Sequence, residues 1–243
     1  MSARGYKEPL EFPRRFYKTV EVAPAEAGGF AVLLDGRTPR SPANRPLLLP
    51  TRALAELIAQ EWEAQGEHIL MTSMPATRLA YTAIDRIGEA HADTAAEVAR
   101  YAAADLICYY AEHPLSLTQR QANAWAPMLQ WAREELAVDL QPAEGIIHRT
   151  QPPQSLQRTQ ELAEALDDFS LAALAHATGL LGSAVLALAV QRGRLSGGEA
   201  FALSRLDEAF QEERWGVDEE AAERTARLAA EAHMLDSWFA ALR

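Results

Sequence analysis

The spacing of apolar residues changes once along this chain, at about Thr51, and that change limits the folds open to it. Before it, Tyr17–Val22 alternates with period two and Phe30–Leu34 is a short apolar run, as is typical of strands. After it, apolar residues recur about every 3.6 positions nearly to the end, as in helices. We therefore expect an α+β fold in which a small antiparallel β-rich module, residues 1–50, precedes a larger all-helical domain, residues 51–243.

Local signals set the expected elements. Asp35-Gly36 is a two-residue turn signal, and Thr51 is a helix cap before an apolar stripe that includes Trp62, so a first helix should run to about Gln65. Pro127 should break or kink the fourth helix. The proline-rich stretch 139–153 is expected to be a long loop. The other expected helices cover about residues 77–87, 93–110, 118–136, 156–169 and 171–191.

The segment 171–190 is about as long as a membrane span, but its content argues against one. It contains His176, Thr178 and Ser183 and has no aromatic residues at its edges. We expect a buried core helix, in which His176 is a hydrogen-bonded core histidine. Four small residues recur at every fourth position and should let a neighbouring helix approach closely: Ala175, Gly179, Ser183 and Ala187.

Two helices near the carboxyl end carry clear signals. Ser196-Gly197-Gly198-Glu199 matches a capping box and predicts a helix start at Gly197. A final helix after Gly216 places seven residues on one seam: Ala221, Thr225, Leu228, Ala232, Leu235, Phe239 and Leu242. We expect this seam to pack on the chain's own core, with the protein a monomer. A module that self-associates through the seam is the alternative.

Charge and cysteine content exclude several function classes. The formal net charge is −11 at pH 7, which opposes binding to nucleic acid and to anionic lipid and suits a protein steered toward a basic patch on a partner. The single cysteine, Cys108, lies in an apolar run and is expected to be buried. Met1–Phe16 lacks the apolar stretch of a signal peptide, so we expect a cytoplasmic protein without membrane insertion.

No recognised catalytic pattern is present in the sequence. It has no Gly-rich phosphate loop, no dinucleotide fingerprint and no nucleophile elbow. None of its six histidines follows a carboxylate at the spacing used in di-iron bundles. We therefore expect no catalytic residue, no metal and no cofactor. The alternative is a helical enzyme whose active site combines carboxylates with His148 or His176.

One group of polar residues, in the stretch 203–216, is not explained by the patterns above. Helical spacing turns Leu206 and Phe210 toward the core and puts Glu208, Gln211 and Trp215 together on another face. An aromatic residue beside carboxylates near a helix end is a surface that can anchor a partner. On spacing alone, a solvated acidic face with a half-buried tryptophan explains the pattern as well.

Several short motifs together resemble those of a known family. The sequence is similar, from about Phe16 to Arg224, to the mitochondrial and α-proteobacterial assembly chaperones for the α subunit of the F-type ATP synthase. Each motif alone is weak, but their order and spacing are specific. The motifs are Arg15-Phe16-Tyr17, Phe30 to Asp35, Glu61 to Gln65, Asp105 to Tyr109, Asn123 to Pro127 and Ser204 to Gly216.

The resemblance implies a function and a set of residues. It implies a chaperone that binds the free α subunit, shields the surface later covered by the β subunit and prevents aggregation before the catalytic head closes, without hydrolysing nucleotide. By position it gives Asp207 and Glu208 functional importance. The predicted partner-binding residues are Asp207, Glu208, Gln211, Glu212 and Trp215. The residues predicted to anchor the fold are Trp62, Asp105 and Trp125.

Overall fold

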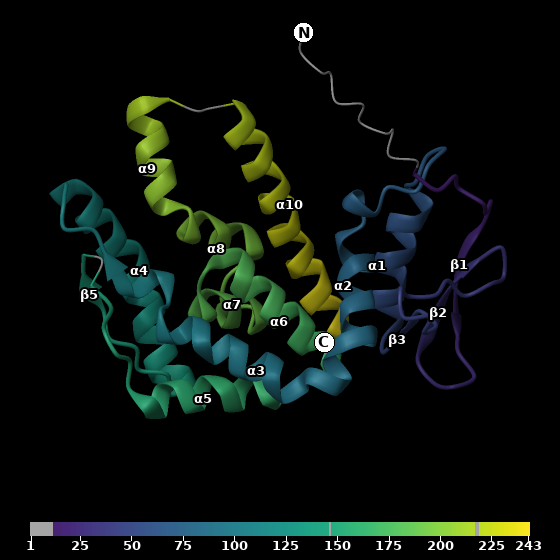
Figure 1. Ribbon diagram of the computed structural model, residues 1–243, viewed down its shortest axis with the longest axis horizontal. Helices are drawn as coiled ribbons and strands as arrows, with labels where there is room; N and C mark the ends of the chain where they lie inside the picture. Colours follow the sequence, from purple (N-terminus) through teal and green to yellow (C-terminus); the bar gives the residue numbers. More distant parts are fainter. Residues whose placement is uncertain (1–11, 146, 217–218) are drawn as a thin grey trace, which may run out of the picture.

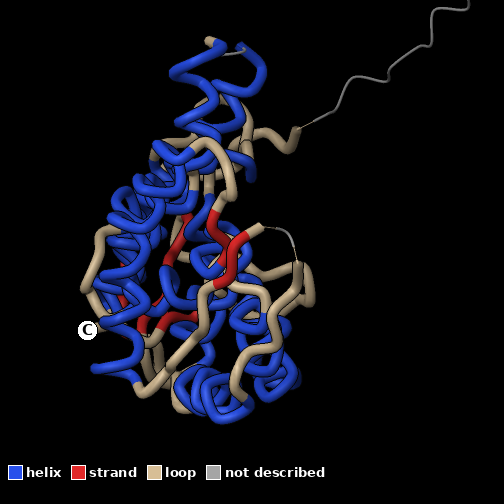
Figure 2. The backbone as a smooth tube through the Cα atoms, turned by 90° about the vertical axis from the view of Figure 1, so that its left-hand side faces the viewer, coloured by secondary structure: helices blue, strands red, loops and turns tan. Residues whose placement is uncertain are grey.

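The computed structural model describes residues 12–145, 147–216 and 219–243 and has the predicted α+β architecture (Figure 1). Most of the segment Met1–Phe16 lies outside these ranges. A three-stranded antiparallel sheet comes first, in the order β1-β2-β3, and helices follow. Figure 2 shows how small a share of the chain the strands make up. The division into two domains at residue 50 stays a prediction.

The sheet is built from β1 (Val20–Pro24), β2 (Phe30–Leu34) and β3 (Leu48–Leu49). The predicted turn at Asp35-Gly36 is present, with φ of 47° and 76°, and the Leu34 and Arg37 backbones exchange hydrogen bonds of 2.8 and 3.0 Å across it. Gly29 is required by the packing between strands. A Cβ there would lie 2.5 Å from the carbonyl oxygen of Leu49, and φ is +76°.

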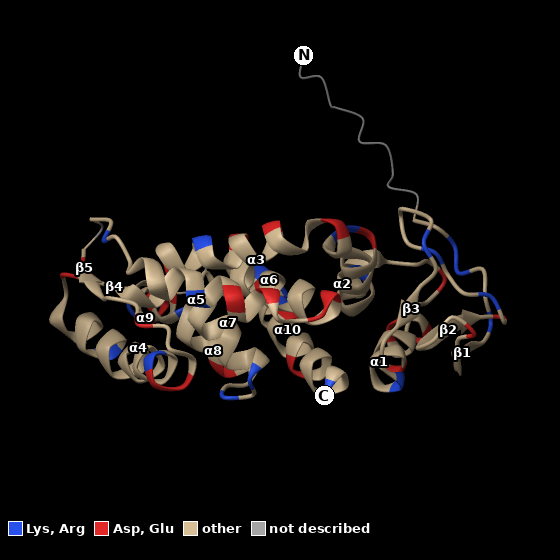
Figure 3. Cartoon of the chain, turned by 90° about the horizontal axis from the view of Figure 1, so that it is seen from below, with Lys and Arg blue, Asp and Glu red and all other residues tan. Residues whose placement is uncertain are grey.

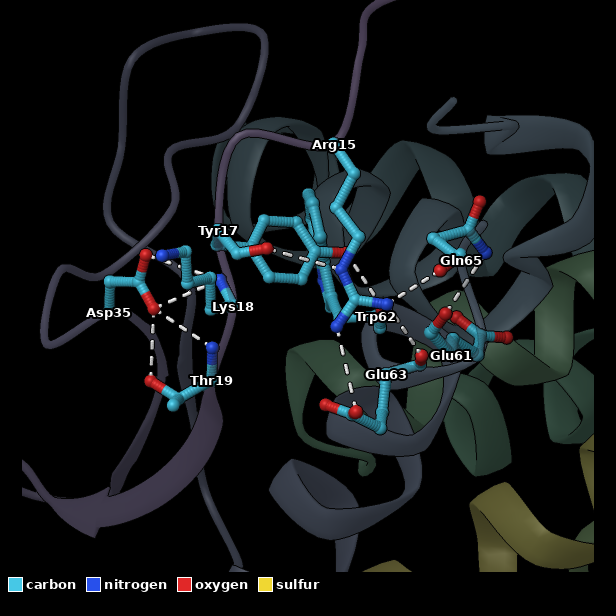
Figure 4. A network of polar contacts seen from close by, with 9 residues as sticks. All are labelled: Arg15, Tyr17, Lys18, Thr19, Asp35, Glu61, Trp62, Glu63 and Gln65. Carbon is cyan, nitrogen blue, oxygen red and sulfur yellow. Dashed lines mark hydrogen bonds and ion pairs between the residues drawn. The ribbon is translucent and has the colours of Figure 1, made fainter. Parts of the chain in front are cut away.

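A polar network joins the segment before β1 to the end of the first helix (Figure 4). The Arg15 guanidinium donates to the carbonyl oxygens of Glu63 and Gln65, at 3.0 and 2.6 Å, and the Tyr17 hydroxyl donates to the carbonyl of Trp62 at 2.6 Å. These carbonyls lie at and just beyond the end of the first helix, where carbonyl groups lack the regular backbone partners of a helix interior. The sheet is therefore fixed to the helical region through both hydrogen bonds and the buried ring of Tyr17.

The helical region follows the predicted positions in most places. Thr51 caps the first helix, its Oγ1 accepting from Leu54 N at 3.1 Å. The remaining elements are α1 (Arg52–Glu63), η1 (Met71–Ser73), α2 (Pro75–Thr82), η2 (Ala83–Ile87), α3 (Gly88–Ala103), η3 (Leu106–Cys108), β4 (Tyr109–Tyr110), α4 (Leu115–Leu136), β5 (Ala143–Glu144), α5 (Pro153–Glu164), α6 (Asp168–Leu181), α7 (Ala184–Gln191), α8 (Gly197–Ser204), α9 (Leu206–Trp215) and α10 (Glu219–Leu242).

The core is continuous from the sheet to the last helix. The buried cluster includes Val32 of β2, Ile58 of α1, Leu174 of α6 and Phe239 of α10. Helices α6 and α7 lie at its centre, with α3, α8 and α10 packed around them (Figure 1). No residue of α7 from Ala184 to Val190 is exposed. This central position explains why the segment is apolar on all sides.

Three expectations about helices are wrong. The helix expected over residues 93–110 ends at Ala103, because the chain turns there into η3 and β4. Pro127 does not break the fourth helix, because it lies inside a continuous α4; burial of neighbouring Trp125, Met128 and Leu129 offsets the hydrogen bond that a proline cannot make. The expected single helix over residues 171–191 is two helices.

The break between α6 and α7 overturns the predicted face of small residues. Gly182 ends α6 with φ of 64°, and Ser183 caps α7 by accepting from Leu186 N at 3.0 Å. Ala187 therefore lies on a different helix from Ala175, and Gly179 is exposed. The segment nevertheless forms the buried core, as predicted. None of the described helices has the length and apolarity needed to cross a membrane.

The predicted capping box is confirmed, and the predicted seam is confirmed over its later residues, whereas its first residue, Ala221, is exposed. Ser196 Oγ accepts from Glu199 N at 3.2 Å and the Glu199 carboxylate accepts from Ser196 N at 2.8 Å, which completes the capping box. In α10, Ala232, Leu235 and Phe239 of the predicted seam are buried. That part of the seam packs on the chain's own helices α8 and α1.

Candidate functional site

Helix α9 stands beside α4 at the end of the molecule opposite the sheet (Figure 1). It follows α8 after the single residue Arg205. Leu206 and Phe210 are 7% and 6% exposed and fasten its inner face to the core, as the spacing predicts. The outer face is left for solvent or a partner.

Polar contacts hold α9 rigidly on α4. Arg120 binds Glu213 through both guanidinium nitrogens, at 2.7 and 2.9 Å, and this ion pair lowers the pKa of Glu213. Gln121 Nε2 donates to Asp207 Oδ1 at 2.7 Å, and partial burial raises the pKa of Asp207. The Arg120 guanidinium also lies 5.3 Å from the ring centre of Phe210. Asp207 therefore faces α4 and positions the helix.

The outer face of α9 carries the other predicted residues. Trp215 is 77% exposed, so it is far from the half-buried state that spacing alone allows. Gln211 is exposed and Glu212 is half-exposed, while Glu208 pairs with Arg205 at 2.8 Å. We call Glu208, Gln211, Glu212 and Trp215 the α9 ridge, with Asp207 at its base. Figure 3 shows further acidic positions on α9 and the neighbouring α10.

The sequence analysis missed one apolar neighbour of the ridge. Leu115, the first residue of α4, is 67% exposed. Arg214 Nη2 lies 3.3 Å from Ser116 Oγ, so the start of α4 lies next to the end of α9. Leu115 and Trp215 are thus exposed apolar side chains at the neighbouring ends of α4 and α9. A leucine directly after Pro114 at a helix start is the only hint in the sequence, and it does not show that the side chain is exposed.

The three predicted anchor residues lie in the interior. Trp62 and Trp125 are 5% and 1% exposed, and Trp125 Nε1 donates to the carbonyl of Leu203 at 3.0 Å. Asp105 is fully buried. It accepts from Ile107 N and Val185 N at 3.3 and 3.1 Å, and desolvation raises its pKa to about 6. Asp105 therefore ties η3 to the start of α7.

The two histidines of the enzyme alternative do not share a site. His148 lies near Tyr109, 3.2 Å from its hydroxyl, whereas His176 contacts Glu231 at 3.2 Å and lines a hollow of about 430 Å³. Glu231 is the one carboxylate among the lining residues of that hollow. Among the residues that the structure describes, no group of three metal-ligating side chains could hold a metal ion. Cys108 is buried, which raises the pKa of its thiol.

Comparisons with known proteins identify a family and similar structures. Residues 14–133 match the family described as ATP12 chaperone protein. The mitochondrial protein atp12 of Schizosaccharomyces pombe is 28% identical over 230 residues, covering 88% of this chain and 78% of that protein. The crystal structure of Atp12 from Paracoccus denitrificans is 42% identical, with a TM-score of 0.88 over 95% of this chain and 99% of that one. A mutant of the P. denitrificans protein, Atp12p, is 41% identical, with a TM-score of 0.88 over 95% and 98%.

Proposed function

The chain belongs to the ATP12 chaperone family, and on that premise we propose that it assists assembly of the F-type ATP synthase by binding the free α subunit. A subunit interface exposed before its partner arrives is prone to aggregate. A chaperone that covers this surface and can be displaced later prevents that. The expected cytoplasmic location and monomeric state are part of this proposal.

The observation that carries the proposal is the exposure of Trp215 on a helix that is otherwise firmly held. A large aromatic side chain in water on a rigid support loses little conformational entropy when a partner covers it. Leu115 extends the apolar contact. The carboxylates of Glu208 and Glu212 would surround that contact and favour a client surface with basic residues. Asp207 would act through its contact with Gln121, by positioning the ridge.

The proposal includes the absence of catalysis. A chaperone of this kind needs a complementary surface and no bond-making step. The α9 ridge has the features of such a surface: an exposed aromatic anchor, an apolar neighbour and a polar rim. No nucleophile with an adjacent base lies among its residues, which are glutamates, a glutamine and a tryptophan.

Suppression of aggregation tests the function. Purified α subunit is diluted from denaturant, and its light scattering is followed with and without an equimolar amount of this chain. We expect the chain to suppress scattering, and the variant with Trp215→Ala and Leu115→Ala together to lose most of that effect while keeping its helical circular dichroism. Equal suppression by parent and double variant would remove the ridge from the proposal. If the parent chain does not suppress scattering, the α subunit is not its client.

A further inference from the structure

A groove crosses α2 at a site that shares no residue with the α9 ridge. The hollow of about 430 Å³ lies where α2, η2, α3, α6 and α10 meet, and a second of about 520 Å³ lies on the other side of α2. Arg78, Thr82 and Arg86 line both hollows, so the two form one feature, which we call the α2 groove. Its size is that of a site for several side chains.

The groove combines an apolar floor with a cationic wall. Leu79, Ile87 and Ala172 line the first hollow, and Met71 and Tyr81 line the second. The guanidinium groups of Arg78 and Arg86 form the wall between the two hollows. The chain as a whole is acidic, with a net charge of −11, whereas this wall is positively charged and would attract an anion.

The carboxylates of the groove are already paired. Glu231 lies 3.6 Å from Arg78 Nη1 and 3.2 Å from His176 Nε2, so it holds both side chains in place. Asp85 accepts from Ser41 Oγ at 2.5 Å and from Ala43 N at 3.0 Å. Arg86 is exposed, and its side chain forms no ion pair or hydrogen bond with the described residues. One guanidinium is therefore available to a ligand.

The backbone at Arg86 is unusual in a way that points to function. Arg86 belongs to η2, a π-helical turn over Ala83–Ile87 between α2 and α3. Such turns are less stable than regular α-helix and occur frequently at functional sites. Gly88 follows this turn directly, and the backbone is irregular again at Ala90, with φ of −119° and ψ of 24°. The irregular backbone and the unpaired guanidinium group therefore belong to the same residue, Arg86.

We propose that the α2 groove binds an acidic segment of a partner polypeptide, with one carboxylate on Arg86 and neighbouring apolar side chains on the floor. A planar carboxylate matches the guanidinium with two parallel hydrogen bonds. A phosphate group would bring a second negative charge close to Glu231, and it would leave the apolar floor uncovered. The segment belongs to the client α subunit, and in this respect alone the inference rests on the proposed function.

Peptide binding tests this inference. Overlapping 15-residue peptides covering the α subunit are immobilised, each also in a form with asparagine and glutamine in place of its acids, and are probed with the full-length chain. We expect parent protein to bind a small set of acidic, partly apolar peptides and to lose them in the amide form. Arg86→Glu should weaken this binding about tenfold or more, while Arg37→Glu, the same charge change at an exposed turn arginine, leaves it unchanged.

The outcomes separate this inference from the proposed function. If intact α subunit is retained but no peptide depends on Arg86, the groove is not a peptide site and the α9 ridge is unaffected. If acidic peptides bind through Arg86 but intact α subunit does not bind, the groove is a peptide site and the proposed client is wrong. Equal binding of acidic and amide peptides overturns the inference. Displacement of bound peptide by inorganic phosphate at equal concentration also overturns it, because the groove would then be a simple anion site.

Discussion

Two tryptophans near the ends of acidic helices differ in burial: one is in the core and the other is exposed. Trp62 lies between Glu61 and Glu63 near the end of α1 and is 5% exposed, while Trp215 follows Glu212 and Glu213 at the end of α9 and is 77% exposed. The local sequences are alike in composition. The difference lies in what the rest of the chain supplies to cover each ring.

At Trp62 the amino-terminal segment supplies the cover. The ring of Tyr17 packs against Trp62 with centroids 5.7 Å apart, and Glu61 accepts from Ala76 N and Thr77 N at 2.7 Å each. At Trp215 the helix ends with Gly216, whose φ is 88°, and Glu213 binds Arg120 of α4. The comparison separates an aromatic residue that stabilises the fold from one available to a partner, a distinction that composition does not make.

The largest expected effect is on Trp62. Trp62→Ala removes a buried indole from the contact between α1 and Tyr17 and should lower the free energy of unfolding by about 3–5 kcal/mol. Urea unfolding measures this. The affinity of the folded fraction for the α subunit should not change. A stable variant that has lost binding would reverse the roles of the two tryptophans.

The buried carboxyl group of Asp105 should make stability depend on pH, unlike the exposed carboxylates of α9. Its pKa is about 6 in the folded chain against 3.8 ordinarily, so the folded state binds more protons between these values. Its stabilising contribution is complete below about pH 4 and is lost as the pH rises through 6, by roughly 3 kcal/mol. Asp105→Asn should remove this dependence. Urea unfolding from pH 4 to 7 tests it, and equal slopes for parent and variant would contradict the assignment.

The effect of Trp215 should be on binding. Trp215→Ala should weaken affinity for the α subunit by about 2 kcal/mol, roughly 30-fold, as expected for an aromatic anchor at an interface. Stability should change by no more than about 0.5 kcal/mol, because the ring is mostly in water. Calorimetric titration and thermal unfolding measure the two quantities. A loss of stability without a loss of affinity would make Trp215 structural.

A smaller effect is expected at Glu208. Glu208→Lys reverses a charge on the ridge and breaks its pair with Arg205, and we expect folding to stay intact within about 0.5 kcal/mol. Association with the α subunit should slow and become less sensitive to salt. Stopped-flow binding at two salt concentrations measures this. Glu56→Lys on α1, which breaks a similar pair with Arg52, is the matched control.

Local signals in the sequence predicted much of the fold. The turn at Asp35-Gly36, the Thr51 cap and the Ser196 capping box are each decided by residues within a few positions, so they could be found without the structure. The break at Gly182 also has local signals, a glycine helix end followed by the Ser183 cap, but the apolar pattern continues across them and they were overlooked. Trp238, fully buried in α10 with its Nε1 3.2 Å from the carbonyl of Phe169, lies beside the predicted seam and was missed.

The candidate site was predictable only in part. Helical spacing grouped Glu208, Gln211 and Trp215 because they belong to one helix. It could not show that Asp207 is tied to Gln121, which is 86 positions away, or that the start of α4 lies next to the end of α9. The α2 groove was missed entirely, since its residues come from distant segments that meet only in the folded chain.

The central claim is that the α9 ridge contacts the client. A photo-crosslinking residue placed at Gln211 and, as a control, at Gln130, an exposed glutamine of α4, tests it most directly. After irradiation with purified α subunit, we expect crosslinks from position 211 to α-subunit peptides on the surface that the β subunit covers, and few from position 130. Crosslinks from position 130 alone, or none from position 211 in a complex that still forms, would contradict it.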